Sequence, residues 1–216
     1  MNSTTKKIVT IAMLSALAFV VFLCTRIPVE FLTFDAKDAI IAISGLLFGP
    51  LASAGISVGV SLVEMVTLSG TGFIGLIMNV LASCSFACTA AFIYKKKHTL
   101  SGAFLGLLSG ILLSTMVMLL WNYLITPLYL GASREAVVGM LVPLLLPFNL
   151  IKNGINATIT MLLYKPLSFA LRKASLLPPR QQSGGSERSQ TIGVTLVSLV
   201  LLATFILLFL VLNGKI

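Results

Sequence analysis

Charged residues are scarce in this chain. Only 10% of the 216 residues are charged, whereas a soluble globular domain usually carries about 25%. The acidic residues are fewest, with 6 Asp and Glu against 15 Lys and Arg. The sequence also lacks a long polar segment, and these shortages together exclude a soluble domain.

Residues suited to catalysis or metal binding are equally few. The chain has one histidine, His98, which falls in the basic run that follows residue 94, and three cysteines, all within apolar segments. Cys84 and Cys88 share a helix face but have no histidine near them, so we interpret them as packing residues. No serine or cysteine has a plausible base and no metal-ligand spacing occurs. We therefore predict no catalytic residue, no metal site and no resident cofactor.

Apolar residues dominate instead, at 57% of the chain with a mean hydropathy of +1.06. Apolar runs of roughly 17–25 residues recur, which is the length that crosses a hydrocarbon core as a helix. The fold class predicted is therefore an all-α integral membrane protein, embedded in the lipid bilayer as a multi-pass protein. The expected helices are 8–25, 35–48, 51–68, 73–94, 101–126, 144–171 and 192–212.

Composition also predicts the division of the chain. Residues 1–173 are predicted to form one membrane-embedded domain. Residues 174–190 are predicted to be a flexible linker, because they contain Pro178-Pro179 and a Ser-Gly-Gly-Ser run. Residues 191–216 then form an extra transmembrane helix. Nothing in this last helix suggests chemistry, so we interpret it as an appended anchor.

Several local signals place the ends and contacts of the helices. Asp35 is expected to cap the second helix with Asp38 in its first turn, and Pro127 is expected to end the fifth helix. Glycines spaced four residues apart let helices approach closely, so we expect internal packing at both sets. These glycines are Gly102, Gly106 and Gly110 in the fifth helix and Gly55 and Gly59 in the third.

The lysines and arginines predict the orientation. Arg26, Lys37, Arg134 and Lys215 fall on one side of the predicted helices, while every other Lys or Arg except Lys152 falls on the side of the N-terminus. The N-terminus is therefore expected in the cytoplasm. The net charge of +9 follows this topology and forms no single basic patch, so it does not indicate a nucleic-acid partner.

Polar residues inside the apolar helices mark the candidate site. Asn149 and Lys152 lie about one turn apart in the sixth helix, and Asn122 lies in a similar setting in the fifth. A charge at the centre of a membrane helix costs at least about 2.5 kcal/mol, so Lys152 should have a polar partner. The alternative is that Lys152 snorkels to water. Both asparagines favour a ligand, and with Glu64 these groups should converge near the outer membrane face.

Four stretches of the chain resemble the substrate-binding S components of energy-coupling factor (ECF) vitamin transporters, and within them the riboflavin-specific members. The resemblance covers about residues 6–173. The stretches that carry it are Leu32-Thr33-Phe34-Asp35-Ala36-Lys37-Asp38 leading to Phe48-Gly49-Pro50, Trp121-Asn122-Tyr123, Pro147-Phe148-Asn149-Leu150-Ile151-Lys152, and the alanine face of Ala12 and Ala16.

This resemblance implies both a fold and a role. The fold would be the six-helix S-component bundle, here with the appended seventh helix. Asn122, Asn149 and Lys152 would hydrogen-bond the isoalloxazine ring of riboflavin. Ala12 and Ala16 would dock on a transmembrane coupling protein, which works with two cytoplasmic ATP-binding subunits to release the vitamin inside.

Other interpretations of the sequence stay open at this point. The chain could be an S component for folate, thiamine or pantothenate, because the Phe-Gly-Pro motif and the alanine face are shared by those members. It could also be an intramembrane enzyme or an accessory subunit that binds no solute. Trp121 and Tyr123 fit an interfacial anchor as well as they fit a ligand pocket.

Overall fold

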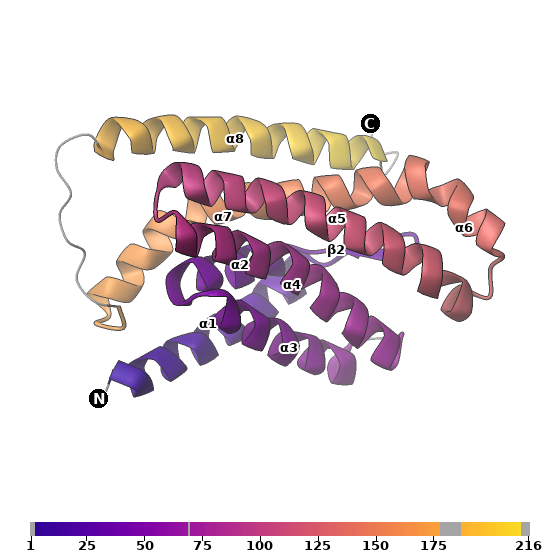
Figure 1. Cartoon of the computed structure of the whole chain (residues 1–216), viewed down its shortest axis with the longest axis horizontal. Helices are drawn as coiled ribbons and strands as arrows, with labels where there is room; N and C mark the ends of the chain where they lie inside the picture. The colour runs from indigo at the N-terminus through magenta and orange to yellow at the C-terminus, as the bar shows by residue number, and fades with distance from the viewer. Residues whose placement is uncertain (1–2, 69, 178–186, 213–216) are drawn as a thin grey trace.

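The computed structural model describes residues 3–68, 70–177 and 187–212, and most of them are helical (Figure 1). Figure 1 shows α8 along one long side of the molecule and α1 on the opposite side. The elements in chain order are α1 (Ser3–Thr25), β1 (Ile27–Val29), β2 (Leu32–Phe34), α2 (Lys37–Phe48), α3 (Pro50–Thr67), α4 (Gly72–Lys96), α5 (Leu100–Leu130), α6 (Arg134–Met140), the π-helical turn η1 (Leu141–Leu145), α7 (Leu146–Lys173) and α8 (Glu187–Leu212).

Five helical segments in the described residues are long and apolar enough to cross a membrane. Their bounds are Thr4–Thr25, Pro50–Thr67, Gly72–Lys96, Leu100–Leu130 and Arg134–Lys173. A shorter apolar stretch, Thr195–Val211, lies within α8. In a helix every backbone N–H and C=O group can bond within the same segment. Apolar segments therefore form helices in a bilayer, where no water is present to bond to the backbone. The prediction of a helical membrane protein is confirmed.

The loop predicted at residues 26–34 contains a small β-hairpin, so the chain is not entirely α-helical. β1 and β2 pair antiparallel, with Ile27 opposite Phe34 and Val29 opposite Leu32. The turn between the strands includes Glu30, whose φ is 53°. Such a short pair has no sequence signal strong enough to separate it from a loop, because neither strand exceeds three residues.

α2 is a short helix buried inside the bundle. It has 12 residues, and every one from Lys37 to Leu46 is buried. The prediction that Asp35 is the capping residue of this helix is wrong, because Ala36 occupies the cap position and makes no side-chain capping bond. The buried N–H of Ala39 instead donates to Asn156 Oδ1 of α7, at 2.8 Å. A side chain of the neighbouring helix α7 therefore accepts a hydrogen bond from a backbone N–H in the first turn of α2.

Two expected helix ends also differ from the structure. α5 continues through Pro127 to Leu130 and ends at Gly131, whose φ of 64° lies in the left-handed region that glycine tolerates. The expected connection at residues 127–142 is mostly helical, because α6, η1 and α7 follow one another without a break. Pro143 and Pro147 lie around the π-helical turn, and since proline has no N–H to donate, a change of hydrogen-bond register occurs there at reduced cost.

The glycines of α5 allow close contact with α4, as predicted. A methyl group on Gly106 would collide with the backbone of Ala90, and one on Gly110 would collide with that of Phe86. The prediction of packing at Gly55 and Gly59 is wrong, since nothing lies within 4 Å of an added Cβ at either position. Spacing alone cannot distinguish the two cases, because a small-residue face packs only where another helix meets it.

α8 starts at Glu187 and packs against α7 (Figure 1). Most of the predicted linker at 174–190 lies outside the described residues. An apolar cluster links α7, α8 and the hairpin, and it includes Leu32, Phe34, Phe148 and Phe209. The hairpin is thus held between the bundle and α8.

Candidate functional site

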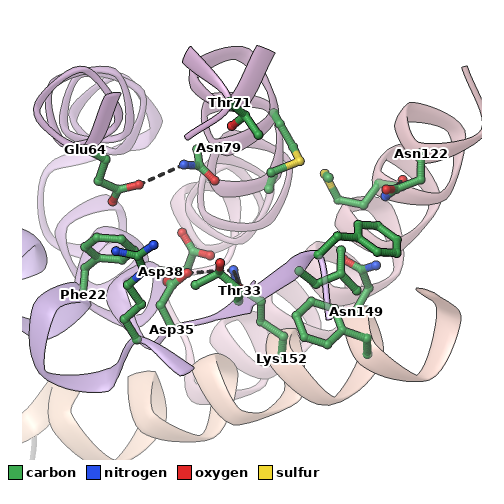
Figure 2. Close-up of a pocket in the computed structure, with 18 of the residues that line it drawn as sticks. Phe22, Thr33, Asp35, Asp38, Glu64, Thr71, Asn79, Asn122, Asn149 and Lys152 are labelled. Carbon is green, nitrogen blue, oxygen red and sulfur yellow. Dashed lines mark hydrogen bonds and ion pairs between the residues drawn. The ribbon is translucent and has the colours of Figure 1, made fainter. Parts of the chain in front are cut away.

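A cavity of about 260 Å³ lies inside the bundle, between the hairpin and helices α1, α2, α3, α4, α5 and α7 (Figure 2). Its apolar wall includes Phe22, Phe31, Met78, Met118 and Phe148. The polar residues that line it are Arg26, Thr33, Asp35, Asp38, Glu64, Thr71, Asn79, Ser114, Asn122, Tyr129, Asn149, Lys152 and Asn153. An apolar enclosure with a few oriented polar groups is typical of a small-molecule site.

Lys152 has the polar partner that the sequence required. Its ammonium contacts Asp35 Oδ2 at 2.8 Å and donates to the carbonyl oxygen of Thr33 at 3.2 Å. The Lys152 side chain is 14% exposed, so it does not snorkel to water. This lysine therefore connects α7 to the end of β2.

Both carboxylate oxygens of Asp35 have a partner. Oδ2 contacts the ammonium of Lys152 at 2.8 Å. Asp35 Oδ1 also accepts from the backbone N–H of Lys37 at 3.3 Å. Asp35 thus forms an ion pair with Lys152 at the cavity. Its position at the start of a helix in the sequence did not indicate this pairing.

The two predicted asparagines face the same cavity from different helices. Asn122 of α5 donates from Nδ2 to the carbonyl oxygen of Met118 at 2.7 Å, and its Oδ1 accepts from Thr126 at 2.8 Å. Asn149 of α7 donates to the carbonyl oxygen of Leu145 at 2.8 Å. These bonds fix both side chains on the wall. Figure 2 shows Asn122 and Asn149 at one end of the cavity and Lys152 farther along it.

The sequence did not indicate a second ion pair, which lies next to the cavity. Lys37 Nζ contacts Glu64 Oε1 at 2.7 Å and Oε2 at 2.6 Å, and both side chains are almost fully buried. Asn79 donates to Glu64 Oε2 at 2.9 Å (Figure 2). From the sequence we expected Lys37 among the cations on the side opposite the N-terminus. Its pairing with Glu64 joins residues 27 positions apart, which local sequence patterns cannot show.

Asp38 and Asn156 complete the polar network. Asp38 Oδ1 accepts from Ser83 of α4 at 2.5 Å. Asn156 of α7 donates from Nδ2 to the carbonyl oxygens of Asp35 and Lys152, both at 2.9 Å. Asp38 thus joins α2 to α4, and Asn156, which also accepts from Ala39, joins α7 to α2. A run of asparagines in an apolar helix could have indicated Asn156, but its partners are distant in sequence.

The predicted docking residues lie elsewhere on the molecule. Ala12 and Ala16 are both exposed on α1, while Leu14 and Ala18 of the same helix are buried against the bundle. α1 itself lies on the opposite side of the molecule from α8 (Figure 1). The structure therefore leaves the alanine face accessible.

The cavity has the polar groups that a solute could bind. Among the described residues, no group of three or more His, Cys, Asp and Glu could hold a metal ion. The cavity presents amide, ammonium and carboxylate groups on a rigid wall. Fold and site together define a polytopic membrane protein with an enclosed polar binding cavity.

Comparison with known proteins identifies the family. The model of the family described as "ECF transporter, substrate-specific component" matches residues 6–164, well over half of the chain. The chain belongs to this family of transporter components. α8 lies outside the matched residues.

Several relatives resemble most of the chain. The riboflavin transporter RibU of Staphylococcus aureus is 32% identical over 78% of this chain and 93% of its own length. The riboflavin transporter FmnP of Bacillus subtilis is 30% identical over 74% of this chain and 90% of its own length. A solved structure, described as the S component of a bacterial ECF transporter, has a TM-score of 0.67 at 31% identity and covers 78% of this chain and 99% of that one.

Proposed function

We propose that this chain is the riboflavin-binding subunit of an ECF transporter, and that Asn122, Asn149 and Lys152 hold the flavin ring. The observation that carries the proposal is that these three side chains, from two helices, line one cavity. The curated relatives are named riboflavin transporters, and their similarity extends over most of their length. These names favour riboflavin over folate, thiamine and pantothenate.

The chemistry of the cavity suits the flavin ring. The pyrimidine edge of the ring has two carbonyl acceptors and an imide donor, which an ammonium and amide groups can satisfy. Asp35 fixes the Lys152 ammonium beside the cavity at 2.8 Å, so little side-chain freedom would be lost on binding. Phe31, Met118 and Phe148 supply apolar contact for the ring.

The proposed arrangement in the membrane is six S-component helices with α8 as an appended seventh span. Residues 1–173 would form the binding domain, residues 174–190 a linker and residues 191–216 the extra helix. The N-terminus would lie in the cytoplasm, because most Lys and Arg residues fall on its side. Lys37 is buried, so it does not count as an exposed cation on the outer side. The excess of exposed Lys and Arg on the side of the N-terminus is therefore larger, which supports this orientation.

Transport requires partner subunits that supply energy. In this proposal Ala12 and Ala16 on α1 contact a transmembrane coupling protein, since their small side chains let a partner helix approach closely. Two cytoplasmic ATP-binding subunits complete the transporter. The exposure of both alanines supports this role.

The visible spectrum of the purified full-length protein tests the proposal. A protein that retains riboflavin is yellow and shows flavin absorption after the free vitamin has been removed. Folate, thiamine and pantothenate, offered in excess, should not displace the flavin. A colourless preparation that also fails to quench the fluorescence of added riboflavin would contradict the proposal.

A further inference from the structure

α8 packs on the bundle through one side of the helix only. The inward residues Ser198, Leu202, Phe205 and Phe209 are three or four positions apart, which places them on a single helical face. Ser198 and Phe209 are only 5% and 8% exposed. Leu207 is 56% exposed, as expected for a side facing lipid. A helix that served only as an anchor would not need such a face.

The inward face of α8 meets α7 just beyond the binding cavity. The ring of Phe205 lies against Gly154, so closely that a methyl group there would collide with the ring. Gly154 follows the cavity residues Lys152 and Asn153 directly. The contact therefore fixes α8 beside the part of α7 that bears the ion-paired lysine.

The same face meets the hairpin. The rings of Phe209 and Phe34 have centroids 4.7 Å apart and are inclined at 45°. Phe34 lies between Thr33 and Asp35, and both of these neighbours line the cavity, whereas Phe34 does not. Phe34 is the last residue of β2, so its contact with Phe209 holds the end of the strand against α8 at the point where Thr33 and Asp35 reach the cavity.

We propose that α8 positions the binding site by holding the hairpin against the bundle through the contact of Phe209 with Phe34, and that this contact slows release of the bound solute. The inference rests on the proposed function for its solute, riboflavin, but the placement of the hairpin is independent of that function. Phe209 is a positioning residue in this account and does not touch the solute. α8 lies on the opposite side of the molecule from α1, and Ala12 and Ala16 are exposed, so α8 can act without covering them (Figure 1).

The test uses full-length protein with Phe209→Ala and, as a matched control on the lipid side of α8, Leu207→Ala. Hydrogen exchange of the amides at residues 27–36 should accelerate in Phe209→Ala and stay at the wild-type rate in Leu207→Ala. Riboflavin should dissociate about 2- to 12-fold faster from Phe209→Ala, the range that corresponds to an aromatic pair. Phe209→Leu keeps an apolar side chain but lacks the ring, so it should return both rates only part of the way to the wild-type values.

A double-mutant cycle makes the inference specific to this contact. Once Phe34→Ala has removed the partner ring, adding Phe209→Ala should change the hairpin exchange and the riboflavin dissociation rate little further. Unchanged hairpin exchange in Phe209→Ala would overturn the inference. If wild-type protein failed to bind riboflavin, the proposed function would be wrong, yet the exchange rates would still decide whether α8 holds the hairpin.

Discussion

The ammonium of Lys152 connects the helix that bears it to the strand that covers the cavity. Its contacts with Asp35 and Thr33 compensate for the cost of removing a charge from water. The same contacts fix the direction of the side chain. A solute that reaches Lys152 therefore meets a group that is already oriented, and stability and binding depend on the same residue.

Lys152→Ala should weaken riboflavin binding by about 1.5–3 kcal/mol, the range for a hydrogen bond to a charged group, or roughly 12- to 160-fold in affinity. Titration with riboflavin measures the change, and Lys95→Ala, at an exposed position, is the control. Thermal unfolding of both variants separates a loss of binding from a loss of fold. Unchanged affinity in a folded Lys152→Ala protein would rule out a role for this lysine.

Substitutions in the Lys37–Glu64 ion pair should change the stability of the protein. Removing one member leaves the other buried and uncompensated, so Glu64→Gln should destabilise the protein by about 3–5 kcal/mol. The double variant Lys37→Met, Glu64→Gln should recover much of that loss, because no charge remains unpaired. Thermal unfolding in detergent checks both, with the exposed Glu135→Gln as control. A double variant less stable than Glu64→Gln alone would refute the assignment.

The three predicted site residues stand out in the sequence because polar groups are conspicuous inside apolar helices. Asn122, Asn149 and Lys152 each interrupt an apolar run, and they line one cavity. Asp35 and Lys37 could not be found this way, since a helix start accepts charged residues without any site. Their partners lie on α7 and α3, and only the fold brings them together.

At the scale of the elements, hydropathy predicted where the helices lie but not how each one ends or packs. Helix formation in a bilayer follows from the apolar runs themselves. The ends depend on local contacts, so α5 passes Pro127 and the hairpin replaces a loop. The glycines of α5 and α3 have the same spacing, yet only those of α5 meet another helix.

This difference between the two helices gives a matched prediction. Gly106→Ala should destabilise the protein, because the added methyl group meets the backbone of Ala90. Gly59→Ala should be neutral or stabilising, because the space there is open and alanine favours a helix by up to about 1 kcal/mol. Thermal unfolding compares the two. Equal effects would mean that α4 and α5 are not in close contact.

At the scale of the whole molecule, the cavity and the proposed docking surface lie in separate regions. The cavity is inside the bundle, while Ala12 and Ala16 lie exposed on α1 and α8 covers the opposite side (Figure 1). Transport should therefore be separable from binding by substitution. The appended helix adds to the hairpin side without obstructing α1.

Ala12→Trp and Ala16→Trp should abolish riboflavin uptake while leaving riboflavin affinity unchanged, because a bulky ring prevents close approach of a partner helix. Uptake by cells that contain the coupling protein and both ATP-binding subunits measures the first effect, and titration of the purified variants measures the second. Leu207→Trp, at the lipid side of α8, should retain uptake. Normal uptake by both alanine variants would place the docking surface elsewhere.

The central claim is that two amides and one ammonium around a single cavity bind the flavin ring, and a fluorescence-quenching titration with riboflavin tests it most directly. Wild-type protein should quench the flavin to saturation, and Asn122→Ala and Asn149→Ala should each weaken binding by about 2- to 12-fold, as expected for a neutral hydrogen bond. Absence of saturable quenching by folded wild-type protein would contradict the account.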